Sequence, residues 1–553
     1  MKVDLIREPR AKAETIEVAG GTSIEELYKK YGKGLKYTVL AARIDYNNVD
    51  LLTKIDKPCT ISFLDMRDLA ANLIYQHSLS LIYLKAVYDV LGEVTVEIQN
   101  SLNKGLYTHI KLAAPVKISQ VKQIEARMWE IVEDDIPIVK EIMPLKDGVE
   151  MLKKMGNPTK AEILKSSGKT KAKFYSIDDY RNYFYGLMVP STGYIDKFEL
   201  RKYKKGVLLR FPHPSNPAEI PPYIDETRLY SAFSEATKWG RLMGVNFVTD
   251  LNQKVRDGSY KELIQLSEAL HEKKIAEIAD MITKRRKRII LIAGPSSSGK
   301  TTFARRLCIQ LRVNGLNPLY MGTDDYFVER KDTPRDENGE MDFENLDAMD
   351  IELFNRNMND LLAGREVDMP TFDFMTGTKV FGKRVTRLEE GRPIVIEGIH
   401  ALNNEMTKFL PADEKFKIYI SPLTQLNIDA HNRIPTTDAR MLRRMVRDFR
   451  YRGHSAQATI QNWPKVRRGE DKNIFPYSGE ADVLFNSVHI YELSVLKKYA
   501  QPLLESIKPD EPEYSEAVRM LKFLRFFDII EDDSIIANNS IIREFIGGSI
   551  FVS

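Results

Sequence analysis

Short apolar runs recur along the second half of the chain, and helix-like segments separate them. The runs cover residues 288–294, 318–323, 393–399, 416–420 and 481–486. Short apolar runs that alternate with helical patterns are typical of a parallel sheet with helices on both faces. The pattern therefore predicts an α/β domain with a doubly wound parallel sheet, which we place at residues 286–500.

The first part of the chain follows other patterns. Residues 1–65 combine short strand-like runs with one helical run, at whose start the spacing of Thr22 and Glu25 predicts a capping box. Residues 66–214 begin with an apolar-periodic helix near residues 69–91 and continue as strands separated by polar turns. These patterns predict a small α/β unit followed by an α+β unit.

Two further segments flank the predicted sheet domain. A proline-rich stretch at residues 213–223 leads into residues 215–285, which we predict to be a linker and a helical segment. The helical pattern closes with a basic run at residues 284–288. Beyond the sheet domain, residues 501–553 are predicted to form a helical extension. We therefore divide the chain into five successive units.

Composition limits the class of protein. The 553 residues exceed what one hydrophobic core supports, which agrees with several domains. With 82 basic and 78 acidic residues, the charge is too balanced for the whole molecule to be a nucleic-acid binder. Cys59 and Cys308 are the only cysteines, which excludes a disulfide framework and a cysteine cluster for zinc. The opening residues lack a signal-peptide core and no segment is apolar enough to span a membrane, so we expect a soluble, cytoplasmic protein.

The first apolar run of the sheet domain ends in a phosphate-binding motif. Residues 294–301 match the pattern GxxxxGK[ST] between a predicted strand and a predicted helix. Glycine allows backbone N–H groups to curl round phosphate oxygens, and the following helix presents the positive end of its dipole. Lys300 then reaches the β- and γ-phosphates, and Thr301 binds Mg²⁺. The predicted ATP-binding residues are Gly294, Pro295, Ser296, Ser297, Ser298, Gly299, Lys300, Thr301 and Thr302.

Acids at two strand ends are candidates for the chemistry beside this motif. Asp324 follows the strand predicted at residues 318–323, where its carboxylate would face the γ-phosphate and take a proton from a hydroxyl group. Asp is also favoured in turns and as a helix N-cap, and the local sequence leaves both interpretations open. Glu397 ends the strand predicted at residues 393–399 and is a second candidate, although a lone acid at a strand end is more often structural.

An arginine-rich helix follows later in the chain. Six arginines lie between residues 440 and 452, and the i, i+4, i+7 spacing of Arg440, Arg444 and Arg447 places these three on one helix face. A run of this kind is usually a solvated helix. Guanidinium groups also stabilise a phosphoryl group during transfer, so the run is a candidate for that task.

Several of these motifs, in this order, resemble the uridine kinase and phosphoribulokinase family. Asp324 falls on the acid of the family's Asp-Ser-Phe-Tyr stretch, which implies that it is the catalytic base. Residues 343–348, Phe-Glu-Asn-Leu-Asp-Ala, are similar to the family's Phe-Asp-His-Pro-Asp-Ala, which implies that Glu344 binds ribose hydroxyl groups. The resemblance covers residues 286–490.

The same resemblance assigns further residues. Phe372 and Phe374 match aromatic residues that flank a nucleobase in the family, and both are equally candidates for core packing. Gly377 stands where the family has a histidine that contacts the pyrimidine. Arg452 is implied as a further acceptor-binding residue. The implied catalytic residues are Lys300, Asp324, Arg444 and Arg447, and the implied metal ligands are Thr301, Asp324 and Glu397.

The N-terminal half resembles a different family. Residues 1–65 are similar to a TGS domain, a small ubiquitin-like fold at the front of threonyl-tRNA synthetases, and residues 66–214 resemble the editing domain of those enzymes. Of four metal-binding positions in that editing pocket, only His77 is retained. The other three positions hold Leu81, Phe184 and Met188. None of these can bind zinc or act as a base, so we expect His77 to be a hydrogen-bonded helix residue.

These features predict an ATP-dependent phosphotransferase. The favoured interpretation is a uridine kinase-like nucleoside kinase that uses Mg²⁺ and transfers the γ-phosphoryl group of ATP to a ribose hydroxyl. A sugar or sugar-phosphate kinase of the phosphoribulokinase type is the alternative within the family, favoured by Gly377 and opposed by the retained aromatic and acidic pattern. An RNA-binding factor with a nucleotide-sensing P-loop domain is the alternative from another class. The expected partner is a nucleoside or sugar, with RNA at the N-terminal half and a second copy of the chain as further candidates; no membrane partner is expected.

Overall fold

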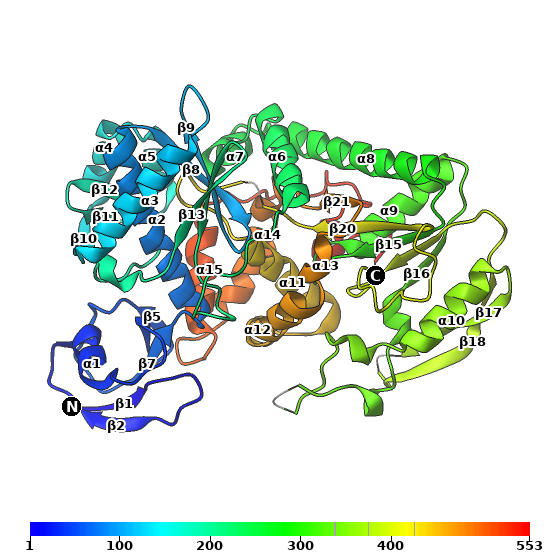
Figure 1. Cartoon of the computed structure of the whole chain (residues 1–553), viewed down its shortest axis with the longest axis horizontal. Coiled ribbons are helices and arrows are strands. Elements are labelled where there is room, and N and C mark those ends of the chain that lie inside the picture. Colours follow the sequence, from blue (N-terminus) through cyan, green and yellow to red (C-terminus); the bar gives the residue numbers. More distant parts are fainter. Residues whose placement is uncertain (337–338, 374, 425, 553) are drawn as a thin grey trace.

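The computed structural model describes residues 1–336, 339–373, 375–424 and 426–552. Figure 1 shows the N-terminal sheet and the parallel sheet of the second half toward opposite ends of the molecule. The first unit is a five-stranded sheet in the order β2-β1-β7-β4-β5, with one helix packed on it. Its elements are β1 Lys2–Ile6, β2 Glu14–Glu17, β3 Thr22–Ser23, α1 Ile24–Tyr31, β4 Val39–Ile44, β5 Asn47–Val49, β6 Lys54–Ile55 and β7 Thr60–Asp65.

The capping box of α1 lies one residue later than predicted. Ser23 is the N-cap: the Glu26 N–H donates to Ser23 Oγ at 3.2 Å, and the Ser23 N–H donates to Glu26 Oε2 at 2.7 Å. Thr22 instead pairs with Ile55 in the short ladder of β3 and β6. The predicted pair Thr22 and Glu25 is therefore wrong, because both pairs satisfy the same sequence pattern and the strand contact decides between them.

Residues 66–214 build two antiparallel sheets around a long buried helix. The sheets have the orders β13-β14-β9-β8 and β10-β11-β12. The helix α2 is buried along most of its length because the sheets and α3 surround it. The elements are α2 Leu69–Leu91, β8 Thr95–Leu102, β9 Gly105–Lys111, α3 Ile118–Glu133, β10 Val139–Pro144, α4 Leu145–Lys154, α5 Pro158–Ser166, β11 Lys171–Ile177, β12 Tyr180–Tyr183, β13 Glu199–Tyr203 and β14 Gly206–Arg210.

Three helices connect this half to the parallel sheet. They are α6 Thr227–Leu242, α7 Val248–Arg256 and α8 Tyr260–Lys284. In Figure 1, α8 runs along the top of the molecule toward the sheet, and its apolar face packs against α9. None of the helices in the described part of the chain combines the length and apolar character that crossing a membrane requires.

The second half contains the predicted parallel sheet, in the order β16-β19-β15-β20-β21, with parallel pairing throughout. All five residues of β15 are buried. Ile290 and Ile292 face α8 and α9, whereas Ile289 and Leu291 face α10. Burial of both faces explains why the strands are continuous apolar runs. The strands are β15 Ile289–Ala293, β16 Leu319–Gly322, β19 Ile394–Glu397, β20 Lys415–Ser421 and β21 Val483–Asn486.

Helices and one hairpin complete this half. A two-stranded hairpin of β17 and β18 extends from the sheet beside α10. Ile541 and Phe545, near the C-terminus, pack into the same core as α8 and α9. The elements are α9 Lys300–Val313, α10 Ile351–Leu362, β17 Glu366–Asp373, β18 Thr378–Arg387, α11 Thr436–Arg452, α12 Ala456–Asn473, α13 Phe475–Ser478, α14 Glu492–Glu505, α15 Tyr514–Leu524 and α16 Arg543–Ile546.

The two halves share a hydrophobic core. One buried cluster contains Ile163 from α5, Val248 and Leu251 from α7, and Met441 and Met445 from α11. Burying such side chains stabilises the contact by about 1.5 to 3 kcal/mol each. The helix α11 is therefore packed against elements of both halves.

Candidate active site

The motif at residues 294–301 forms a tight loop at the carboxyl end of β15. Gly299, which precedes α9, has a φ of 83°, a conformation that favours glycine. Ser297 also lies in the left-handed region, with a φ of 61°. A side chain at Gly294 would collide with the Ile420 carbonyl of β20. The loop leaves the first N–H groups of α9 without partners inside the helix, which makes it a site for an anion.

Lys300 and Thr301 begin α9 and lie beside Glu397 at the end of β19. The Lys300 ammonium donates to the Gly294 carbonyl at 3.1 Å, and the Thr301 hydroxyl donates to Glu397 Oε1 at 3.0 Å. The surrounding protein raises the pKa of Glu397 to about 7; Lys300 opposes this rise and Asp324 adds to it. Lys300 and Asp324 thus both act on the charge of the Glu397 carboxyl.

Asp324 and Asp325 follow β16 but differ in their surroundings. Asp325 Oδ2 accepts a hydrogen bond from Arg384 of β18 at 2.5 Å, so Asp325 is held by the hairpin. The Asp324 side chain is open to solvent. The protein around it nevertheless raises its pKa, an effect that Lys300 and Arg452 oppose and Asp325 reinforces.

Glu344 lies beside α12. Its Cβ is so close to Gly469 that a side chain at position 469 would collide with it. The surrounding protein raises the pKa of Glu344 to about 7; Glu470 adds to the rise, and Arg444 and Lys300 oppose it. Glu344 therefore faces both the loop and the arginine helix.

The predicted aromatic residue Phe372 packs in the core, and its ring contacts lead toward Glu344. Phe372 in β17 is buried in the core, and its ring lies edge-on to Phe327 at a centroid distance of 5.8 Å. Phe327 also contacts Phe343, which precedes Glu344. Phe374, the other predicted residue, lies outside the described residues.

An arginine lies over Gly377, where the resemblance would place a histidine. Gly377 has a φ of 72°, and a Cβ there would lie 2.7 Å from Arg330 Cβ and Nε. The Arg330 N–H donates to the Gly377 carbonyl at 2.9 Å. A histidine would therefore be strained and would displace this arginine.

Arg440 at the start of the arginine run is fully buried. It forms an ion pair with Glu470 of α12, and its Nε donates to the Ser296 carbonyl of the loop at 3.1 Å. Glu470 also accepts from the Ser296 N–H at 3.2 Å and from Arg467 at 2.8 Å. Arg440 therefore fixes the loop to the buried face of α11 and to α12.

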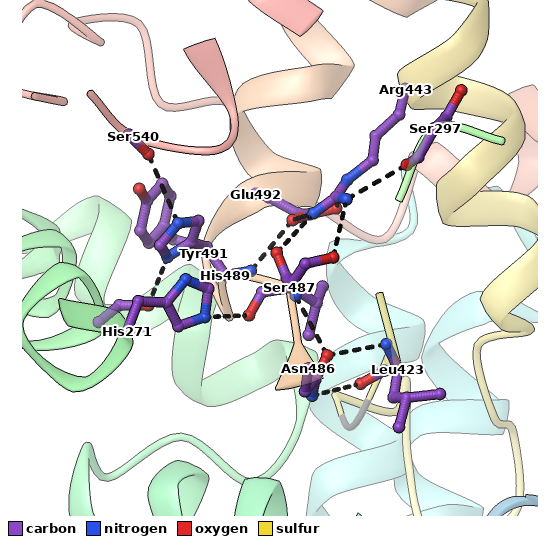
Figure 2. Close-up of polar contacts among 12 residues, drawn as sticks. His271, Ser297, Leu423, Arg443, Asn486, Ser487, His489, Tyr491, Glu492 and Ser540 are labelled. Carbon is purple, nitrogen blue, oxygen red and sulfur yellow. Dashed lines mark hydrogen bonds and ion pairs between the residues drawn. The ribbon is translucent and has the colours of Figure 1, made fainter. Parts of the chain in front are cut away.

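Arg443 makes a second buried link, which Figure 2 shows. Its guanidinium donates to both carboxylate oxygens of Glu492, at 2.9 and 2.6 Å, and to the Ser297 carbonyl at 3.3 Å. The Ser487 carbonyl at the end of β21 also accepts from it at 2.9 Å. Arg443, which the sequence left without a role, thus joins the phosphate loop to β21 and α14.

Arg444, Arg447 and Arg452 surround one acid on the accessible side of α11. Asp448 is buried and pairs with Arg447 at 2.7 Å, Arg444 at 3.3 Å and Arg452 at 3.6 Å. Arg444 also donates to the Ser296 hydroxyl at 2.8 Å. Arg440 and Arg444 thus both contact Ser296 of the loop, Arg440 as a fully buried residue, and Arg447 lies beside Arg444 around Asp448.

The sequence did not indicate one acid that contacts the loop region. Glu544 of α16 accepts hydrogen bonds from the Thr302 N–H at 3.2 Å and from the Thr302 hydroxyl at 2.7 Å. Ile541 covers Gly299, because a Cβ on that glycine would lie 2.5 Å from Ile541 Cγ2. Glu544 lies 242 residues after Thr302, and no local pattern marks such a contact.

The editing-like positions of the N-terminal half form an apolar cluster. Leu81, Phe184 and Met188 are buried in one core, and the His77 ring packs against Phe184 and Tyr185 at centroid distances of 6.1 and 5.8 Å. Burial lowers the pKa of His77 to about 4, and Lys173 adds to this effect. His77 is therefore a neutral, packed side chain at ordinary pH.

The predicted residues of the second half gather around one cation. Lys300 is close enough to affect the pKa of Asp324, Glu344 and Glu397. These acids lie at the carboxyl edge of the sheet, where loops of α/β proteins bind ligands. A site with one lysine, several acids and adjacent guanidinium groups has the groups that transfer of a phosphoryl group requires.

Comparison with known proteins relates the N-terminal half to another enzyme family. It matches threonine–tRNA ligases in their TGS and editing region. The ligase of Hahella chejuensis is 28% identical over 187 residues, which are 34% of this chain and 29% of the ligase. The ligase of Methylobacillus flagellatus is 29% identical over 184 residues, 33% of this chain and 29% of the ligase. The chain thus spans less than a third of the length of these ligases.

The second half matches kinases. Residues 289–494 match the sequence model of the "Phosphoribulokinase / Uridine kinase family". The uridine kinase of Staphylococcus aureus is 31% identical over 197 residues, which are 35% of this chain and 86% of that kinase. A solved structure described as a "Possible Uridine Kinase" from Bacillus stearothermophilus is 23% identical, with a TM-score of 0.24. The match covers 36% of this chain and 88% of that chain. With nearly the whole length of a curated uridine kinase matched, the chain belongs to the phosphoribulokinase / uridine kinase family of ATP-dependent kinases.

Proposed function

We propose that the protein is a nucleoside kinase that transfers the γ-phosphoryl group of ATP to a hydroxyl group of the ribose. The observation that supports this most is the common environment of Lys300, Asp324 and Glu344, in which one lysine affects the pKa of both acids. A base and an acceptor-binding acid must both lie on the acceptor side of the phosphoryl group, opposite the leaving ADP, and near the cation that binds the phosphoryl group.

The residues of the loop bind the donor. The hydroxyl groups of Ser297 and Ser298 are buried and have no hydrogen-bond partner among the described residues, which suits a loop that closes round phosphate oxygens. Lys300 contacts the β- and γ-phosphates, and the first N–H groups of α9 bind the phosphates further from the acceptor.

Asp324 takes the proton of the attacking hydroxyl group. Asp324 is an exposed residue, so an acceptor can approach it, whereas Asp325 is tied to Arg384. Arg444 and Arg447 stabilise the charge on the phosphoryl group in the transition state. Glu344 accepts hydrogen bonds from the acceptor.

The donor set at the loop fits Mg²⁺. Thr301 Oγ1 and Glu397 Oε1 lie 3.0 Å apart, and Asp324 is close enough to raise the pKa of Glu397. Hydroxyl and carboxylate oxygens are the ligands that this hard cation prefers, and such acids ionise readily beside it. When bound, Mg²⁺ would neutralise charge on the β- and γ-phosphates. Thr301, Glu397 and Asp324 are the residues that would hold it.

A sugar phosphate is the second candidate for the acceptor. The observation in its favour is Arg330, whose side chain lies over Gly377 in place of the expected histidine. A guanidinium group pairs with a phosphate better than with an uncharged base. Phe372 and Phe343 near Glu344 favour the nucleoside, because aromatic rings bind a base by stacking.

The test is a panel of nucleosides and sugar phosphates supplied with Mg-ATP, with release of ADP as the readout. We expect release that depends on a nucleoside and is lost in Lys300→Ala, which should keep its fold because the ammonium bonds to loop carbonyls and not to the core. Release of ADP only with sugar phosphates would show that a sugar phosphate, and not a nucleoside, is the acceptor. No release with any acceptor, together with salt-dependent binding of RNA, would instead favour a nucleotide-sensing protein.

A further inference from the structure

The segment between β20 and α11 leaves the sheet and binds to the N-terminal half. We call residues 427–434 the anchor segment. The Asn427 side chain donates to the carbonyls of Ile98 and Gln99 in β8, at 3.1 and 3.0 Å, and the Ile98 N–H donates to the Ala430 carbonyl at 2.8 Å. The pairing of β8 with β9 shifts register at this point, which frees these backbone groups from the ladder. The anchor segment therefore docks on a bulge of the N-terminal half.

A buried lysine of the N-terminal half makes the second contact. Lys160 of α5 is only 2% exposed, and its ammonium lies 2.7 Å from His431 Nδ1 and bonds to Asn182. Asp429, fully buried, lies 3.9 Å from the same ammonium. The His431 ring also stacks on Phe184, a residue of the editing-like pocket. The contact is thus polar, charged and enclosed, which fixes its geometry more strictly than apolar packing does.

The same residues hold the beginning of the arginine helix. Asn427 Oδ1 accepts from the Ile434 N–H at 3.2 Å, so the side chain that binds β8 also fixes the residue before Pro435, the N-cap of α11. In the first turn of α11, Asp438 is buried and accepts from Arg519 of α15 at 2.6 Å. The start of α11 is therefore fixed by groups outside the parallel sheet.

We propose that Asn427 and His431 are positioning residues, through which the N-terminal half sets the tilt of α11 and with it the placement of Arg444 and Arg447. This rests on the proposed function, which assigns those two arginines to phosphoryl transfer. Arg440 and Arg443 tie the middle of α11 to the loop, so the anchor segment controls the tilt of the helix and not its distance from the loop.

The magnitude follows from helix geometry. Arg440 is held by the loop, and Arg444 lies about 6 Å further along the axis, at 1.5 Å per residue. A tilt of about 10° about Arg440 displaces Arg444 by about 1 Å, and a misplacement of about 1 Å can cost about 100-fold in rate. The loss should fall on kcat, because the charge of the arginines is needed most in the transition state.

The experiment compares Asn427→Ala and His431→Ala with Asn462→Ala in the full-length protein. Asn462 on α12 is exposed and its amide donates to the Ala458 carbonyl of the same helix at 2.9 Å, so it controls for loss of an amide. We expect kcat for ADP release, with the best acceptor of the panel, to fall about tenfold or more in both anchor variants. KM for ATP should change less than about twofold, and Asn462→Ala should match the wild type. Thermal unfolding of each variant checks that it is folded.

A double-mutant cycle separates positioning from a merely structural role. If the anchor segment acts through Arg444 and Arg447, adding Asn427→Ala to a variant that carries both Arg444→Ala and Arg447→Ala should cost little further turnover. The inference is overturned if folded anchor variants keep the wild-type kcat, or if the two losses multiply in full. Unchanged turnover in the variant without both arginines would overturn their assignment to phosphoryl transfer, and with it this inference, whereas the acceptor panel tests the kinase function separately. Reduced turnover in Arg444→Ala together with full activity in the anchor variants would overturn the inference alone.

Discussion

Asp324 and Asp325 show how one position along the chain changes what a carboxylate can do. Asp325 is paired with Arg384 at 2.5 Å, whereas Asp324 is open to solvent beside Lys300. We expect Asp324→Asn to lower kcat by about 10²- to 10⁴-fold, because the variant keeps the size of the side chain but removes the base. Asp325→Asn should lower Tm slightly and leave kcat within a few-fold. Steady-state kinetics and thermal unfolding measure both; the reverse result would place the base at Asp325.

Glu344 predicts a pH dependence of acceptor binding. Its pKa is raised to about 7 by the surrounding protein, with Glu470 and Asp342 adding to the rise and Arg444 and Lys300 opposing it. Below this pH the carboxyl is protonated and accepts hydrogen bonds weakly, whereas above it the carboxylate accepts them strongly. KM for the acceptor should therefore fall as the pH rises through about 7.

The matched variant for this prediction is Glu344→Gln. It should raise KM above pH 7 by about 10- to 100-fold, which corresponds to the about 1.5 to 3 kcal/mol of one charged hydrogen bond. It should also remove the dependence on pH. The exposed Glu340, which pairs with Lys465, provides the control in Glu340→Gln. A KM that keeps its pH profile in Glu344→Gln would show that another group titrates.

The sequence predicted individual site residues best where a residue type in its motif has few alternative roles. A lysine and a threonine after a glycine loop, and an acid after each neighbouring strand, were sufficient to predict which side chains lie near one another. The local sequence could not distinguish Asp324 from Asp325, because Arg384 is 59 residues away on a hairpin. Nor could it show that Glu344 is surrounded by protein, because Gly469 and Glu470 belong to a later helix.

Among the elements, α11 carries arginines with two different tasks. Arg443 and Glu492 are both buried, with side chains 0% and 1% exposed, so Arg443→Ala leaves a buried carboxylate without its partner. We expect it to lower the free energy of unfolding by about 3 to 5 kcal/mol. Arg447 is more accessible and pairs with Asp448 on the same helix. Arg447→Ala should cost less stability than Arg443→Ala and act mainly on kcat, because Arg444 and Arg452 still pair with the buried Asp448. Denaturant unfolding measures the loss of stability in both variants, and steady-state kinetics measures kcat. Equal losses of stability in Arg443→Ala and Arg447→Ala would contradict the assignment of different tasks to the two arginines.

Helical spacing predicted a single face for Arg440, Arg444 and Arg447, but it did not predict the partners or the burial of each arginine. The structure places Arg440 in the buried side with Glu470, and Arg444 and Arg447 around Asp448 near the loop. Periodicity gives the angle of each side chain about the helix axis and not the element that covers it. The partners Glu470 and Glu492 lie 30 and 49 residues after their arginines, so only the fold brings them together.

For the whole molecule, the parallel sheet was predictable because both of its faces are buried and its strands are continuous apolar runs. The contact between the two halves was not predictable. It depends on Asn427, Lys160 and a bulge in β8, which are ordinary polar residues and backbone groups in their own segments. Such contacts have no local period, and a single sequence carries no signal for them.

Glu544 has a consequence for the binding of the nucleotide. Its carboxylate accepts from the N–H and the hydroxyl of Thr302, in the first turn of α9. One N–H cannot donate a full hydrogen bond to a carboxylate and to a phosphate at once, and two anions at this place would repel each other. If the phosphates of ATP use this N–H, Glu544 has to withdraw. The C-terminal segment is then a tethered competitor, present at a fixed effective concentration that dilution of the protein does not change.

A competitor of this kind sets the apparent affinity by the fraction of molecules in which it has withdrawn. If that fraction is about one tenth, weakening the contact by Glu544→Gln should tighten the binding of ATP by up to about tenfold. Calorimetric titration with ATP measures this, and Asp532→Asn, which changes an exposed acid that accepts hydrogen bonds from Ser534, is the control. Weaker binding in Glu544→Gln would mean that the carboxylate supports α9. Tighter binding would mean that the C-terminal segment lowers the protein's own affinity for ATP, without any second ligand.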